Sequence, residues 1–308
     1  MFVISMLTRT EERTGHSAAI YALRTAPDGF YSAAADGLLV HWHKYDVNFG
    51  RAVANVEGGK FLSFDTLEDG GLVAGALDGG VHWLYPDEPE RNLHVAQHTR
   101  GVFAVLRVGE EVFTAGGDGV LTKWNARTGR TLESLPVSGN SLRCIVHEAP
   151  QDILLVGASD GLIHTVGRED FQLKRSSLAN DPSVFAVAVP NRPYPYVISG
   201  GRDAQLRMRD LTDGHIVQVV SAHNSTINDL AFSPNGHYLA TASRDKTVKL
   251  WDAESWKLLK VCEVVRDRGH VNSVNCLLWL DDETLITAGD DRRILTWTLE
   301  TSELGTRN

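Results

Sequence analysis

The sequence lacks the residue patterns on which most enzymes and membrane proteins depend. It contains no Walker-type phosphate loop and no His-Glu-x-x-His pair. Its three cysteines are far apart and have no metal-ligand spacing, which favours a reducing compartment. Residues 1–15 carry four charged side chains and no long apolar run, so we expect neither a signal peptide nor a membrane span. We therefore predict a cytoplasmic protein without catalytic residues, metal or cofactor.

Basic residues are also in the minority. The chain has 30 Lys and Arg against 39 Asp and Glu, which gives a formal net charge of −9. A protein that binds nucleic acid usually presents a basic surface, so this balance makes nucleic acid an unlikely partner unless the charge is segregated. Glycine is abundant, with 28 residues, as expected for an all-β chain with many turns.

What the chain has instead is an aspartate that returns every 40 to 46 residues in the same kind of turn. Such a period, sustained over seven copies, is typical of a repeat architecture. In four copies a glycine follows the aspartate, as in a tight hairpin turn. The seven positions are Asp36, Asp78, Asp118, Asp160, Asp203, Asp245 and Asp291.

The sixth copy shows the pattern of strands most clearly. Residues 227–232, 239–243 and 248–252 are short runs rich in Val, Ile, Leu and Thr, and a fourth run covers 256–261. Asn235-Gly236 supplies a reversal between the first two runs. Each repeat is therefore expected to form one sheet of four antiparallel strands.

The pairs Ala222-His223 and Trp251-Asp252, and Gly269-His270 with Trp297, resemble WD40 repeats. The resemblance covers nearly the whole chain, and it implies a seven-bladed β-propeller in a single domain. The repeats are placed at about 14–50, 51–94, 95–135, 136–176, 177–220, 221–264 and 265–302. The run from Phe2 to Leu7 is expected to complete the last blade, with 1–10 as the closing strand; the alternative is a frayed N-terminal arm.

The WD40 pattern implies a structural tetrad in which a His, a hydroxyl, an Asp and a Trp are hydrogen bonded in series. In the sixth copy Ser243 competes with Thr241 for the hydroxyl role. Four copies supply the full set: His16, Ser32, Asp36 and Trp42; His98, Thr114, Asp118 and Trp124; His223, Thr241, Asp245 and Trp251; and His270, Thr287, Asp291 and Trp297.

Copies two, four and five lack both the His and the Trp. The Trp position holds Leu84, Val166 and Arg209, and alignment puts Gly58, Ser138 and Asn180 at the His position. The joint loss is reasonable, because a half-satisfied buried network leaves orphaned polar groups at roughly 1–3 kcal/mol each.

The resemblance also implies a binding surface where the first strands meet the mouth of the central channel. We predict a scaffold that binds one or more proteins or peptides there, with acidic and bulky apolar side chains on the ligand. The alternative is that the phenylalanines pack between blades and the arginines pair with loop acids. The predicted rim residues are Tyr21, Phe61, Phe103, Arg143, Phe185, Arg202, Asn228, Arg244 and Asn275.

Four other functions stay open at this point. The arginines on the rim suggest nucleic acid as an alternative ligand. An enzyme that uses the channel would need convergent His, Asp or Glu side chains, which the aligned first strands do not show. Tyr21, Phe103 and Phe185 could form a cage for a methylated lysine, although three arginines would repel that cation. His41 and His43 share one face of a strand and could touch a metal, although solvated or packed histidines are the simpler reading.

Overall fold

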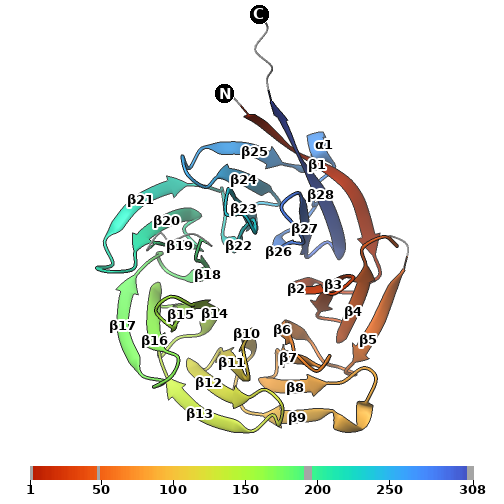
Figure 1. The fold of residues 1–308 in the computed structure, drawn as a ribbon, viewed down its shortest axis with the longest axis vertical. Helices are drawn as coiled ribbons and strands as arrows, with labels where there is room; N and C mark the ends of the chain where they lie inside the picture. The colour runs from red at the N-terminus through yellow and green to blue at the C-terminus, as the bar shows by residue number, and fades with distance from the viewer. Residues whose placement is uncertain (1–2, 47–48, 191–195, 304–308) are drawn as a thin grey trace, which may run out of the picture.

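Seven four-stranded antiparallel sheets surround a central axis in the computed structural model, which describes residues 3–46, 49–190 and 196–303 (Figure 1). From inside to outside, blade one holds β2 (Ile20–Ala26), β3 (Gly29–Ala34), β4 (Leu38–His43) and β5 (Gly50–Asn55). Blade two holds β6 (Phe61–Thr66), β7 (Leu72–Ala76), β8 (Gly80–Leu84) and β9 (Leu93–Ala96). Blade three holds β10 (Val102–Val108), β11 (Glu111–Gly116), β12 (Val120–Asn125) and β13 (Thr131–Pro136).

The same order continues around the ring. Blade four holds β14 (Leu142–Glu148), β15 (Ile153–Ala158), β16 (Leu162–Gly167) and β17 (Leu173–Leu178). Blade five holds β18 (Val184–Ala188), β19 (Tyr196–Gly201), β20 (Gln205–Asp210) and β21 (Ile216–Ser221). Blade six holds β22 (Ile227–Phe232), β23 (Tyr238–Ser243), β24 (Val248–Asp252) and β25 (Leu258–Cys262). The described helices are two short ones, η1 (Pro89–Arg91) and α1 (Val264–Asp267), both in loops.

Blade seven is assembled from both ends of the chain. Its inner strands are β26 (Val274–Trp279), β27 (Thr284–Gly289) and β28 (Arg293–Glu303), and its outer strand is β1 (Val3–Thr14). The first strand, red in Figure 1, lies antiparallel beside the last, in dark blue. The prediction that an N-terminal strand closes the ring is therefore confirmed, although this strand extends to Thr14.

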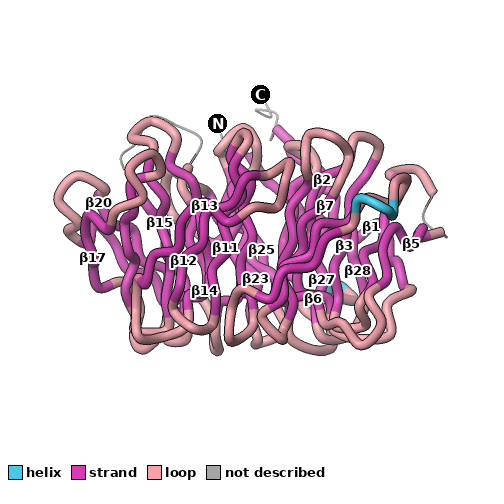
Figure 2. Tube along the Cα trace, turned by 90° about the horizontal axis from the view of Figure 1, so that it is seen from below, coloured by secondary structure: helices cyan, strands magenta, loops and turns pink. Residues whose placement is uncertain are grey.

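The core lies between the blades. Seven apolar clusters are buried, one at each interface between successive blades. The strands follow this arrangement: β7 and β8 in blade two are buried at every residue, whereas outer strands such as β21 are mostly exposed. From the side the blades form a shallow ring with loops on both faces (Figure 2).

Leu7 tests the closure directly, because this β1 side chain is 1% exposed and belongs to the cluster between blades six and seven. We expect Leu7→Ala to lower the free energy of unfolding by about 2–5 kcal/mol, as for other buried leucines. Denaturant titration measures it, with Thr8→Ala, an exposed change on the same strand, as the control. Equal stability of the two variants would mean that the N-terminal strand is a loose arm.

Candidate functional site

A β-bulge recurs on the innermost strand of every blade and determines which side chains face the channel. In blade one Ile20 pairs with Ala34 and Ala22 with Ala33, so Tyr21 is the extra residue. A bulge re-aims the side chain that it carries. The residue before each bulge is an apolar anchor, 0% exposed in all seven blades: Ile20, Phe61, Val102, Leu142, Val184, Ile227 and Val274.

The seven bulged residues line one cavity of about 310 Å³ in the channel. We call them the bulge ring. Its aromatic and apolar members lie in blades one, two, three and five, and two asparagines lie in blades six and seven. The ring consists of Tyr21, Leu62, Phe103, Arg143, Phe185, Asn228 and Asn275.

The sequence-based prediction for blade two was wrong by one residue. Phe61 is fully buried as the anchor of its blade, and Leu62 is the residue of this blade that lines the cavity. The error comes from the His position, which was aligned to Gly58. Phe61 and Leu62 are both bulky and apolar, and the spacing from inner strand to repeat aspartate varies between blades. No sequence signal in blade two therefore distinguishes the anchor from the bulged residue.

Arg143, the member of the bulge ring from blade four, contacts two other members. Its guanidinium carbon lies 4.2 Å from the ring centroid of Phe103 and 5.2 Å from that of Phe185. Its Nε donates to Ser159 Oγ at 2.7 Å. Burial lowers the pKa of Arg143, and no described carboxylate forms an ion pair with it. The result is a fixed, partly desolvated cation between two aromatic faces.

This geometry argues against the methyl-lysine cage. Two of the three proposed cage aromatics, Phe103 and Phe185, already hold a cation from within the chain. Burial and the nearby Asp290 carboxylate raise the pKa of Tyr21, the third proposed cage residue. The bulge ring is therefore better suited to an anion near Arg143 than to a second cation.

The remaining predicted rim residues are distributed around the mouth. Asn228 Nδ2 donates to the Val274 carbonyl, and Asn275 Nδ2 donates to the Ile20 carbonyl, so each amide bridges to the next blade. Arg202 and Arg244 are exposed and do not line the channel cavity. Their backbone N–H groups donate to Ser183 and Thr226 of the inner-strand loops, which fixes them beside the mouth.

Asp229 is a channel residue that the sequence reasoning missed. It follows the bulged Asn228, lines the channel cavity and accepts hydrogen bonds from the backbone N–H groups of Leu230 and Leu277. Burial raises its pKa to about 6, against the lowering effect of those two hydrogen bonds. Because Leu277 belongs to blade seven, Asp229 joins the inner strands of two blades.

The four predicted tetrads are hydrogen bonded in the structure as a series. In blade six His223 Nδ1 lies 3.0 Å from Asp245 Oδ2, and His223 Nε2 lies 2.7 Å from Thr241 Oγ1. Trp251 Nε1 donates to the same Thr241 hydroxyl at 3.1 Å. Ser243 instead accepts from the Asp245 N–H and donates to the Ser225 carbonyl. Because the Thr241 hydroxyl oxygen accepts the hydrogen bond of the indole, its own O–H donates to His223 Nε2. His223 is then a neutral imidazole with its proton on Nδ1.

The other three tetrads have the same geometry. His–Asp distances are 2.9, 3.1 and 3.0 Å, and histidine–hydroxyl distances are 2.7, 2.8 and 2.8 Å in blades one, three and seven. The three indoles donate to these hydroxyls at 2.7, 3.0 and 2.9 Å. The tetrads lie between strands with the hydroxyls fully buried, which suits a structural role and not a nucleophile.

In blades four and five, which lack tetrads, a polar side chain donates to the repeat aspartate. Ser138 Oγ donates to Asp160 at 2.6 Å, and Asn180 Nδ2 donates to Asp203 at 2.9 Å. Arg209, at the Trp position of blade five, is 8% exposed, and its guanidinium donates to the carbonyls of Gly214 and Leu178. These side chains are only partly satisfied without the histidine and tryptophan, because Asn180 Oδ1 and Arg209 Nε are buried and have no hydrogen-bond partner among the described residues.

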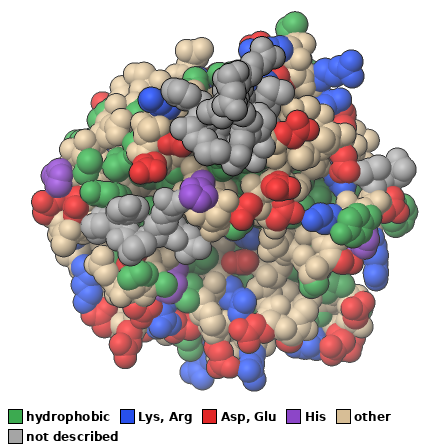
Figure 3. Space-filling model, turned by 45° about the horizontal axis from the view of Figure 1, so that its top comes forward, with side chains coloured by type: hydrophobic (Ala, Val, Ile, Leu, Met, Phe, Trp, Pro, Cys, Tyr) green, Lys and Arg blue, Asp and Glu red, His purple; other side chains and the backbone are tan. Residues whose placement is uncertain are grey.

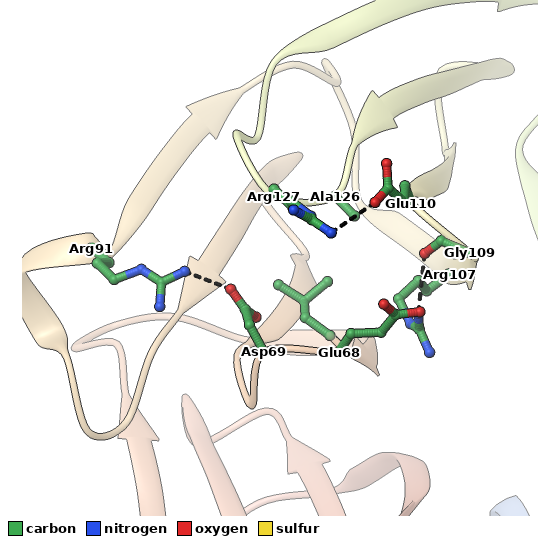
Figure 4. A pocket seen from close by; sticks show the side chains of 9 residues that line it. Glu68, Asp69, Arg91, Arg107, Gly109, Glu110, Ala126 and Arg127 are labelled. Atoms are coloured by element: carbon green, nitrogen blue, oxygen red, sulfur yellow. Dashed lines mark hydrogen bonds and ion pairs between the residues drawn. The ribbon is translucent and has the colours of Figure 1, made fainter.

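A second cavity, of about 400 Å³, lies between blades two and three and is also rich in arginine (Figure 4). Its arginines differ from Arg143 because each one has an acidic partner. Arg91 pairs with Asp69 at 2.5 Å, Arg107 with Glu68 at 2.7 Å and Arg127 with Glu110 at 2.8 Å. This cavity is electrically balanced, so it is a weaker candidate for an anionic ligand than the bulge ring.

Two groups have some metal-ligand character. His41 Nε2 and His43 Nε2 lie 2.8 and 3.8 Å from the two oxygens of Asp28, so both histidines face one carboxylate. Asp210, Asp213 and His215 cluster in the turn before β21, where the carboxylates accept local N–H groups. Contacts with neighbouring residues therefore explain the position of both groups without a metal ion.

Comparisons with known proteins agree with this architecture. The family model described as WD domain, G-beta repeat matches residues 214–252 and 259–298. The WD40 beta propeller domain of Doa1 superposes with a TM-score of 0.82 and 17% identity over 96% of this chain and 97% of that one. This chain is a seven-bladed β-propeller that carries WD40 repeats.

The curated proteins that this chain resembles are longer than it is. Nuclear distribution protein PAC1-1 of Uncinocarpus reesii is 26% identical over 56% of this chain and 33% of its own length. Nuclear distribution protein nudF of Aspergillus niger is 32% identical over 36% of this chain and 24% of its own. The 66 kDa stress protein of Physarum polycephalum is 22% identical over 95% of this chain and 48% of its own. The chain thus spans less than half of each of these relatives.

The hydroxyl of a tetrad can be removed without changing side-chain volume. Thr241→Val leaves the buried His223 Nε2 and Trp251 Nε1 without a partner, so we expect the free energy of unfolding to fall by roughly 2–5 kcal/mol. Thr241→Ser keeps the hydroxyl and is the matched control. Denaturant titration separates them; equal losses would show that the methyl packing, and not the hydrogen bonds, carries the effect.

The buried tetrad histidines should also make the free energy of unfolding depend on pH. Burial lowers the pKa of His16, His98 and His223, although each paired carboxylate opposes the shift. The unfolded chain therefore binds more protons as pH falls through about 6.5, and the free energy of unfolding should fall with it. Asp229 acts in the opposite direction below about 6, where its folded form is protonated first.

This prediction is tested by denaturant titrations from roughly pH 8 down to about pH 6, a range in which the histidines dominate. We expect stability to decline steadily over that range. His215→Gln, a change at an exposed histidine, should leave the slope unchanged. A flat or rising profile in the unmodified protein would contradict the neutral tetrad histidines.

Proposed function

We propose that this WD40 propeller is a non-catalytic scaffold that binds an acidic, partly apolar peptide or protein surface at the mouth of its channel, in the cytoplasm. Arg143 carries the proposal: a cation held between Phe103 and Phe185 and lacking a carboxylate partner among the described residues. A carboxylate of a ligand would complete it with a charge-assisted hydrogen bond. Arg202 and Arg244 beside the mouth extend the positive charge.

Apolar members of the bulge ring give the ligand a second kind of contact. Tyr21 is 37% exposed, and Leu62, Phe103 and Phe185 are partly exposed around the same cavity. Arginine and aromatic side chains most often dominate binding energy at protein interfaces. The supporting frame is rigid, because every bulged residue follows a fully buried anchor.

Nucleic acid is the second candidate ligand, favoured only by the three arginines near the mouth. The net charge of −9 opposes it, and basic and acidic side chains are interspersed over the face in Figure 3. Among the described residues no helix is long and apolar enough to cross a membrane. If nucleic acid were the ligand, binding at low salt would be lost steeply as salt is raised. No mobility shift with single- or double-stranded nucleic acid at low salt would eliminate this candidate.

The rim is tested by affinity purification from the native host. We expect a variant with Arg143, Arg202 and Arg244 each changed to Glu to lose the retained protein partner, because like charge would then meet its acidic surface. Arg202→Glu with Arg244→Glu, both at exposed positions, should weaken retention without affecting the core. Arg51→Glu with Arg127→Glu and Lys257→Glu, exposed changes away from the mouth, is the charge-matched control.

Outcomes of this purification are distinct. Loss in the rim variants but not in the control supports the rim as the binding surface. Unchanged retention in a folded rim variant would rule out the rim, and a propeller that retains no partner at all would contradict the scaffold.

A further inference from the structure

The outermost strand of a blade is the last strand of its sheet and exposes one row of backbone hydrogen-bonding groups. Proteins protect such edges with charged side chains, because an uncharged edge pairs readily with another strand. Most outer strands of this propeller follow that rule. Their charged residues include Arg51 in β5, Glu133 in β13, Lys174 and Arg175 in β17, Lys260 in β25 and Arg9, Glu11, Glu12 and Arg13 in β1.

Strand β21 of blade five departs from the rule. Its six residues read Ile-Val-Gln-Val-Val-Ser and contain no charged side chain. Ile216, Val217 and Val219 are 46%, 43% and 47% exposed, which is unusual for three β-branched residues in one strand. The four-residue β9 has no acidic or basic residue except His94, but it is shorter. Strand β21 lies on the outer wall of the ring (Figure 1), away from the channel mouth.

We propose that β21 pairs antiparallel with β21 of a second copy of this chain, so that two propellers join edge to edge about a twofold axis. A twofold axis places the same strand on both sides of the contact, so the strand must be compatible with itself. A strand such as β17 would bring Lys174 and Arg175 against their own copies. Strand β21 has no charge to oppose, and its valines and isoleucine are the residue types that pair best across strands.

The charges at the two ends of β21 favour this partner. Asp210 and Asp213 lie before its first residue, and Asp213 is 66% exposed. At the other end Lys249 Nζ contacts the carbonyl of Ala222, the residue that follows the strand. An antiparallel copy brings the acidic end of each strand toward the basic end of its partner. Arg175, which donates to the carbonyls of Leu211 and Thr212, lies at the same end as the two aspartates, so the complementarity comes from the exposed Asp213 and from Lys249.

An apolar recess beside β21 provides room for side chains of the second copy. It has a volume of about 330 Å³ and lies between blades five and six, lined by Val217, Met208, Phe232 and Trp256 among others. Trp256 has φ 59°, a left-handed conformation that is costly for a bulky residue. The equivalent turns in blades three and five have glycine there, Gly129 and Gly214. Blade four also has an aromatic residue at this position, Phe171 with φ 48°, whereas Trp256 forms an aromatic wall beside β21.

This contact is independent of the proposed rim. It leaves both channel mouths open, and a pair of propellers would present two bulge rings to a partner. Failure of one proposal leaves the other intact, because the rim variants and the β21 variants are on different surfaces.

Analytical ultracentrifugation over a wide range of protein concentration tests the pairing. We expect the unmodified chain to approach twice the 33.8 kDa mass of one chain as its concentration rises. Val217→Lys with Val219→Lys places like charges across the twofold contact, so the dimer should dissociate at least about tenfold more readily. Leu132→Lys, a change at a 46% exposed residue of β13, is the matched control and should leave the dimer intact.

Amide hydrogen exchange gives a second, local readout. The outward amides of residues 216–221 should exchange more slowly as concentration rises, and those of β13 should not change. A single-chain mass at the highest concentration measured would overturn the pairing, as would a dimer that is insensitive to the two lysines or equally disrupted by Leu132→Lys. If β21 instead pairs with an extended segment of another protein, the purified chain would keep its single-chain mass at every concentration.

Discussion

Closure of the ring by β1 and β28 is the constraint on which the rest of the structure depends. Eleven residue pairs join the two strands. Arg293 adds two hydrogen bonds of 2.7 Å to the carboxylate of Glu12, and Arg13, 2% exposed, donates to Thr296 Oγ1 at 2.9 Å. Without these contacts blade seven would end at an unpaired edge, and its interfaces with blades six and one would be free to separate. Closure fixes the curvature of the ring, and the curvature brings seven bulged residues to one cavity.

Within the closed ring, two kinds of connection hold the blades. Apolar clusters fill every interface and supply most of the burial. Polar contacts then set the positions of the inner strands: Asp229 and Ser63 reach into the next blade, and the indole of Trp83 donates to the Ala126 carbonyl in blade three. The tetrads act inside single blades, which explains why three blades dispense with them while the ring stays complete.

Sequence alone was sufficient for the architecture and for the tetrads, since both rest on patterns repeated at fixed spacing. It was less effective at the channel. A shift of one residue in blade two led to the buried Phe61 being predicted in place of the partly exposed Leu62, because successive side chains of a strand point to opposite faces. The contact of Arg143 with two phenylalanines joins residues from three blades, and no pattern within a repeat reports it. The same holds for Asp229, whose partner Leu277 lies in another repeat.

Native-state hydrogen exchange tests the closure most directly, because it reports on the two strands separately. If β1 is an integral strand of blade seven, the amides that it contributes to the pairing with β28 exchange only with global unfolding, at the same free energy as those of β27. Rapid exchange along β1 while β27 and β28 stay protected would show that blade seven has only three stable strands. That result would contradict the proposed closure of the ring.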